Sequence, residues 1–83
     1  MKSQIKPSIG RVVIVVLPEV MVPFNNHSPL APAVIVNTLE NTSYEDSEVN
    51  LKVLNDAVEN TWMTSVPYSE DMEEGTWHWP PRV

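Results

Sequence analysis

The sequence predicts an all-β domain, a small five-stranded SH3-like barrel with a long proline-rich first loop. Short runs of β-branched and aromatic residues alternate with connections rich in proline, glycine and other turn residues. The order of the connections, from a long first loop to a tight later turn and a brief last strand, is similar to an SH3-like barrel. An OB-like barrel or a simple meander fits the same spacing. No internal repeat or domain boundary is evident, so we expect residues 1–83 to form one domain.

The most distinct strand is predicted over residues 11–17, Arg-Val-Val-Ile-Val-Val-Leu, after an extended approach through Pro7. Side chains alternate between the two faces of a strand. Val13, Val15 and Leu17 then share one face with Arg11, and the residues between them form a second apolar face. This strand is therefore either covered on both sides or in contact with another subunit.

Residues 18–32 contain four prolines, at positions 18, 23, 29 and 32, and are predicted to form a long loop with neither helix nor central strand. The loop also contains apolar side chains, including Val20, Met21, Val22, Phe24 and Leu30. We expect such a loop to fold back on the barrel or to contact a partner, because long loops in compact domains usually serve a function.

Four further strands are predicted over residues 33–39, 49–54, 61–66 and 76–79. The run at 49–54 alternates cleanly, with Val49, Leu51 and Val53 facing inward. Pro80 and Pro81 end any pairing of the last strand, since neither has an N–H group to donate.

Size and charge limit the kinds of partner. A chain of 83 residues without cysteine buries a small core and has no disulfide to stabilise it, so we expect a homo-oligomer. The net charge of −6 disfavours general binding of DNA or RNA, whose backbones are anionic. The longest apolar run, residues 12–17, is far shorter than a membrane span, and Pro18 and Glu19 interrupt any signal-like segment. We therefore expect a cytoplasmic protein without membrane contact.

Catalytic and metal-binding signatures are not found. The sequence has no nucleophile elbow and no phosphate-binding loop, and its two histidines, His27 and His78, lie far apart. Most acids fall in two clusters, at 40–48 and 70–74, which lack the spacing of a calcium loop. We interpret these clusters as solvated faces, or alternatively as a decoy for a basic partner protein. The prediction is a non-enzyme without cofactor or metal.

The carboxyl end is the candidate ligand site. Trp77 and Trp79 share one face of an extended strand, so with Tyr68 they could stack on a flat ring such as a nucleotide base. Arg11, His78 and Arg82 could contact its phosphates or carboxylates. The alternative is that these tryptophans are core side chains in a domain with a single phenylalanine, which is the interpretation we favour for Trp62.

Three segments resemble a group of small uncharacterised proteins of tailed phages and prophages. These are the opening Lys-Pro-Ser-Ile-Gly-Arg-Val at 6–12, the central Val-Asn-Leu at 49–51 and the closing Gly-Thr-Trp-His-Trp-Pro at 75–80. The resemblance implies a phage-encoded protein in the bacterial host cell. We expect it to counteract host defence without catalysis, by sequestering a nucleotide-type signal or by binding a defence protein. The alternative is a minor virion or assembly protein.

Overall fold

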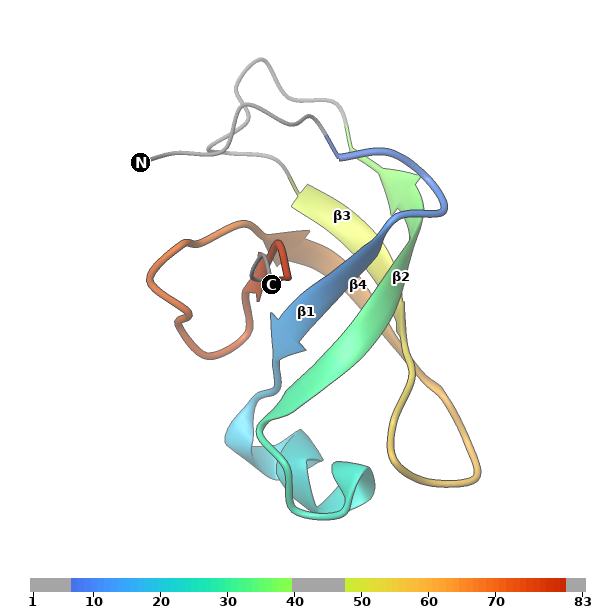
Figure 1. Cartoon of the computed structure of the whole chain (residues 1–83), viewed down its shortest axis with the longest axis vertical. Helices are drawn as coiled ribbons and strands as arrows, with labels where there is room; N and C mark the ends of the chain where they lie inside the picture. The colour runs from blue at the N-terminus through green and yellow to red at the C-terminus, as the bar shows by residue number, and fades with distance from the viewer. Residues whose placement is uncertain (1–6, 40–47, 81–83) are drawn as a thin grey trace.

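The computed structural model describes residues 7–39 and 48–80, which form one curled antiparallel sheet with a short 3-10 helix (Figure 1). The sheet has five strands in the order β4-β3-β2-β1-β5. In chain order the elements are β1 (Val12–Val16), η1 (Glu19–Asn25), β2 (Leu30–Thr38), β3 (Glu48–Val53), β4 (Thr61–Pro67) and β5 (Trp77–His78). The prediction of a small, mostly β fold with five strands is confirmed, and the sheet curls into a half-barrel.

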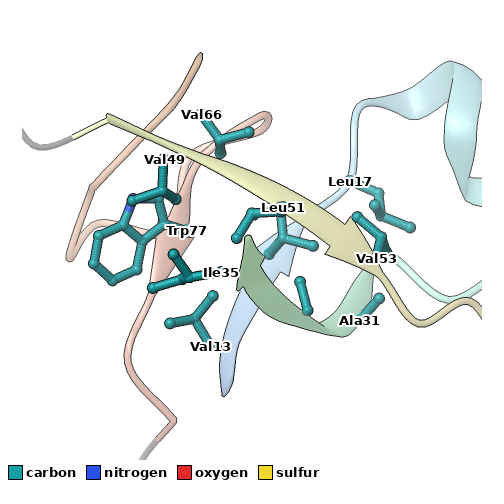
Figure 2. Close-up of a cluster of buried hydrophobic side chains, with 11 residues drawn as sticks. Val13, Leu17, Ala31, Ile35, Val49, Leu51, Val53, Val66 and Trp77 are labelled. Carbon is teal, nitrogen blue, oxygen red and sulfur yellow. The ribbon is translucent and has the colours of Figure 1, made fainter. Parts of the chain in front are cut away.

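The core lies on the inner face of the sheet, where the alternation predicted for β1 and β3 holds. Val13 and Val15 on β1 and Val49, Leu51 and Val53 on β3 are completely buried. The full cluster also contains Leu17, Ala31, Ala33, Ile35, Val66 and Trp77. Figure 2 shows these aliphatic side chains gathered around β3, with the indole of Trp77 among them near Val49 and Ile35.

Two irregularities bend the sheet at the level of Asn50. The β2–β3 register shifts between Ile35 and Asn37, and the β3–β4 register shifts between Val49 and Leu51. In β4 the extra residues include Ser65, which has a left-handed φ of 53°. The backbone N–H of Ser65 donates to Oδ1 of Asn50 at 2.9 Å, which holds the bulge in place. Such bulges increase twist, and here they allow a small sheet to curl around its core.

The first connection is shorter and more structured than predicted. The prediction that the prolines exclude a helix is wrong, because residues 19–25 form the 3-10 helix η1 with Pro23 inside it. A 3-10 segment this short has few i→i+3 bonds, and the N–H that Pro23 lacks removes at most one of them. Its Met21 and Val22 pack on the core, as expected for a loop that folds back, whereas Val20 and Phe24 remain exposed.

The prediction that prolines exclude a central strand up to position 32 is wrong, since β2 starts at Leu30 and pairs Pro32 with Ile14 of β1. The carbonyl of Pro32 accepts a hydrogen bond from the backbone N–H of Leu54 at 2.9 Å. Leu54 lies just past the end of β3, and the N and C=O of one strand residue face the same neighbouring strand. The N–H that Pro32 lacks would therefore have pointed to Leu54, where the β2–β3 ladder ends, so the sheet loses only one hydrogen bond at its margin.

The outer face of β1 and β2 is apolar and uncharged. It consists of three cross-strand pairs, Val12 with Val34, Ile14 with Pro32, and Val16 with Leu30. Val12 and Leu30 are exposed and Ile14, Val16 and Val34 are half-buried.

No helix of the described segments has the length and apolar character required to cross a membrane. Within residues 7–39 and 48–80 there is also no grouping of three or more histidine or acidic side chains suited to a metal ion.

Candidate binding surfaces

Strand β5 is placed beside β1 by the glycine that precedes it. Gly75 has a φ of 80°, a conformation that favours glycine, and its N–H donates to the Val16 carbonyl at 2.8 Å. The N–H of Val16 in turn donates to the carbonyl of Thr76 at 2.9 Å. This pair of bonds fixes the chain as it enters β5 and sends the side chain of Trp77 toward the inner face.

Trp77 is a core side chain. It is 1% exposed, and its ring contacts Tyr68 and Trp79 edge-on, with centroid separations of 4.8 and 5.2 Å. The backbone N–H of Ser69 donates to the Trp77 carbonyl at 3.0 Å, which ties the end of β4 to β5. Because protein side chains already cover its ring, Trp77 offers no free face on which a base could stack.

Trp79 shares the side of Trp77, as the alternation predicts, and is half-buried against the core cluster. The guanidinium of Arg11 lies 5.1 Å from the centroid of the Trp79 ring, in the range of a cation–π contact. The structure thus brings together four predicted site residues, Arg11, Tyr68, Trp77 and Trp79. In this arrangement Arg11 packs on the ring that we expected to hold a base.

His78 lies apart from these residues, because it alternates to the outer face of β5 and pairs with Ile14 of β1. Burial lowers the pKa of His78, since the charged imidazolium would lose water there. The predicted contact through Arg82 lies outside the described residues.

Three ring nitrogens at this end of the chain are buried without a hydrogen-bond partner, namely Nε1 of Trp77, Nδ1 of His78 and Nε1 of Trp79. A buried donor that has lost its water and gained no partner costs about 1–3 kcal/mol. The aromatic end therefore contributes to stability chiefly through packing of its rings.

Trp62 is not a core residue, and that interpretation is wrong. It is 61% exposed and lies on the outer side of β4, opposite Lys52 of β3. The register explains the error. Val66 faces inward opposite Val49, and regular alternation along β4 would place Trp62 on the same side as Val66. The bulge lies between Val66 and Trp62 and reverses this alternation, so Trp62 faces outward.

The best-defined polar contacts outside the sheet join two connections at the end of the molecule where η1 lies (Figure 1). Asn25, at the end of η1, is 3% exposed. Its Nδ2 donates to the carbonyls of Ser28 and Leu30, both at 3.0 Å. Its Oδ1 accepts the backbone N–H of Asp56, in the β3–β4 turn, at 2.6 Å. We call this set of bonds the Asn25 latch.

A weaker exposed contact supports the latch, as Nδ2 of Asn26 donates to Oδ2 of Asp56 at 3.2 Å. Asn26 and His27 both have left-handed φ angles, of 51° and 63°, which turn the chain out of η1 and toward β2. Sequence reasoning did not identify the latch. The available signal was the Asn-Asn pair itself, since asparagine tolerates this conformation better than most residues.

Comparison of the chain with protein-family models, with curated proteins and with solved structures found no match in any of the three.

Proposed function

We propose that this chain is a phage-encoded, non-catalytic binding protein that counteracts host antiviral defence by binding a defence protein. A protein partner is favoured by one observation: several apolar side chains on ordered elements of the fold are exposed to solvent. Val20, Phe24, Val58 and Trp62 are each more than half exposed, and all lie outside the aromatic end. Exposed apolar side chains on rigid elements are typical of protein interaction sites. The phage origin and the host-cell location rest on the resemblance of the two chain ends and of the central segment at 49–51.

Sequestration of a nucleotide-type signal is the weaker form of this proposal. It requires a free aromatic face at the predicted site, where Trp77 offers none and Arg11 covers part of Trp79. The exposed ring of Trp62 belongs to the outer side of β4, away from that site. A melting experiment with cyclic and ADP-ribose-type nucleotides tests it, because a ligand that binds the folded state raises Tm. An upward shift that is lost in Trp79→Ala would favour the nucleotide form over the protein-binding form.

A minor virion or assembly role is the second candidate, and the uncharged outer face of β1 and β2 favours it. A sheet face without charge suits contact with another subunit, as in the homo-oligomer expected from the small core. Co-purification of the chain with intact, washed particles would support this candidate.

For the architecture we propose an SH3-like barrel. The support is the strand order, in which four strands follow one another as a meander and β5 adds to the free edge of β1. The bridge between Tyr68 and Trp77 brings the two ends of the sheet together. An experimental structure with β4 and β5 joined through the described bridge would support closure, and a flat open sheet would contradict it.

Infection tests the proposed function directly. The chain is expressed in bacteria carrying cloned defence systems, and the efficiency of plating of a restricted phage is measured with and without it. We expect restored plating with at least one system and recovery of the corresponding defence protein with the purified chain. Unrestored plating with every system, together with the chain in purified particles, would establish the virion candidate instead.

A further inference from the structure

Two neighbouring connections at one end of the sheet present apolar side chains to solvent. Phe24 and Val20 on η1 are 66% and 74% exposed, and Val58 in the β3–β4 turn is fully exposed. Figure 1 shows η1 and the β3–β4 turn projecting from the same end of the sheet. We call these three side chains the loop tip. No part of the core requires them to be apolar, so their exposure needs another explanation.

The loop tip is held in a fixed arrangement by the Asn25 latch. Asn25 directly follows Phe24, and its Oδ1 bonds the backbone of Asp56, two residues before Val58. A third connection joins them, because the N–H of Glu19 donates to Oε1 of Glu74 at 2.6 Å. Loops that are already ordered lose little conformational entropy when a partner binds, which favours their use as a contact surface.

The charged side chains of the two connections that form the loop tip are all acidic. The two connections contain Glu19, Asp56 and Glu59, all exposed, and the bond from the Glu19 N–H holds the carboxylate of Glu74 beside Glu19. Neither lysine nor arginine occurs in residues 19–29 or 54–60. Connections that combine exposed apolar and acidic side chains are complementary to a surface that combines apolar and basic side chains.

We propose that the loop tip is the docking surface for a basic protein, with Phe24 and Val58 as the apolar anchors and Glu19, Asp56 and Glu59 as the charged rim. This inference rests on the proposed function as a protein-binding chain and adds the surface and the chemistry of the partner. A second copy of the chain is a poor occupant of this end, since it would bring the same acids face to face. Anionic lipid and nucleic acid are repelled for the same reason.

A backbone NMR titration of the ¹⁵N-labelled full chain with synthetic peptides tests the proposal. The probes are an amphipathic leucine–lysine peptide, a serine–lysine peptide of equal length and charge, and a leucine–glutamate peptide. We expect the leucine–lysine peptide alone to bind measurably at physiological salt. The perturbed amides should lie within residues 19–30 and 54–60, and the affinity should fall as salt is added.

Two matched double variants test whether peptide binding depends on the loop tip itself or on any exposed apolar side chains. The double variant Phe24→Ser with Val58→Ser should weaken binding of the leucine–lysine peptide about tenfold or more, as expected when anchors are removed. The control is Ile9→Ser with Val36→Ser, which removes two exposed apolar side chains at the opposite end of β1 and β2 and should bind as the wild type does. Dispersed amide spectra of both variants confirm that they fold.

Four results would overturn the inference. The first two are perturbed amides centred elsewhere, such as residues 70–74, and equal binding of the serine–lysine peptide. The third is unchanged affinity in the Phe24/Val58 variant, and the fourth is concentration-dependent shifts of the loop-tip amides without peptide, which would assign the surface to a second copy. Failure here would leave the infection result for the wild-type chain standing, because restored plating by the wild type shows that the chain acts without showing which surface it uses.

Discussion

Asn25 is the polar residue on which the arrangement of the connections most depends. Within the described residues, its side chain makes three hydrogen bonds to backbone groups, at Ser28, Leu30 and Asp56, while the residue is 3% exposed. We predict that Asn25→Ala lowers the free energy of unfolding by about 1–3 kcal/mol, since it removes three part-buried hydrogen bonds to the backbone together with a buried side chain. Urea denaturation measures this change.

The control for this variant is Asn60→Ala, at an exposed position before β4, which should change the free energy of unfolding by less than about 0.5 kcal/mol. Equal effects of the two substitutions would mean that the latch contributes nothing to stability.

His78 should make stability depend on pH. Burial lowers its pKa in the folded state, so the unfolded chain binds the proton more readily. Its contribution is therefore fully present above the unfolded pKa of about 6.5 and decreases as the pH falls from there toward the lower folded pKa. We predict that the wild type loses stability over this window and that His78→Gln loses less. Parallel stability–pH curves for the two proteins would contradict this assignment.

At the scale of single residues, sequence reasoning predicted side-chain direction well and burial less well. It placed Trp77 and Trp79 on one side because alternation depends only on local backbone geometry. It favoured Trp62 over Trp77 as a core residue, the reverse of what the structure shows, because that ranking depends on the register of β4 against β3 and on the bulge there.

At the scale of elements, β3 provides the most direct test of the core. Leu51 is completely buried within this strand, whereas Leu54, just beyond the end of the strand, is 40% exposed. We predict that Leu51→Ala costs about 2–5 kcal/mol, because it removes buried apolar contacts and leaves a cavity. Leu54→Ala, the same change in chemistry, should cost much less. Chemical denaturation of both variants checks the difference, and similar costs would place β3 in the wrong register.

Strand positions could be predicted from the sequence because β-branched runs and alternation are local signals, as residues 11–17 and 49–54 illustrate. The start of β2 could not, since Pro32 is acceptable only because β3 ends opposite it. The short helix η1 was missed for a similar reason. Its Met21 and Val22 are stabilised by packing on a core that the local sequence does not specify.

At the scale of the whole molecule, the uncharged outer face of β1 and β2 is the expected contact between copies. We predict that sedimentation velocity finds self-association, and that Val12→Lys raises the dissociation constant at least about tenfold by placing a charge in the interface. Val20→Lys, at an exposed position on η1, is the matched control and should leave it unchanged. A wild type that stays monomeric at high concentration would contradict the homo-oligomer prediction.

The central claim is that the chain acts by presenting the loop tip to a protein, while its aromatic end serves the core. The most direct measurement is the efficiency of plating of a restricted phage in bacteria that express the wild type, the Phe24→Ser and Val58→Ser double variant, or Trp79→Ala, each at equal level of folded protein. The account predicts restored plating with the wild type and with Trp79→Ala, and loss of restoration with the loop-tip variant. Full activity of the loop-tip variant, with activity lost in Trp79→Ala, would contradict it.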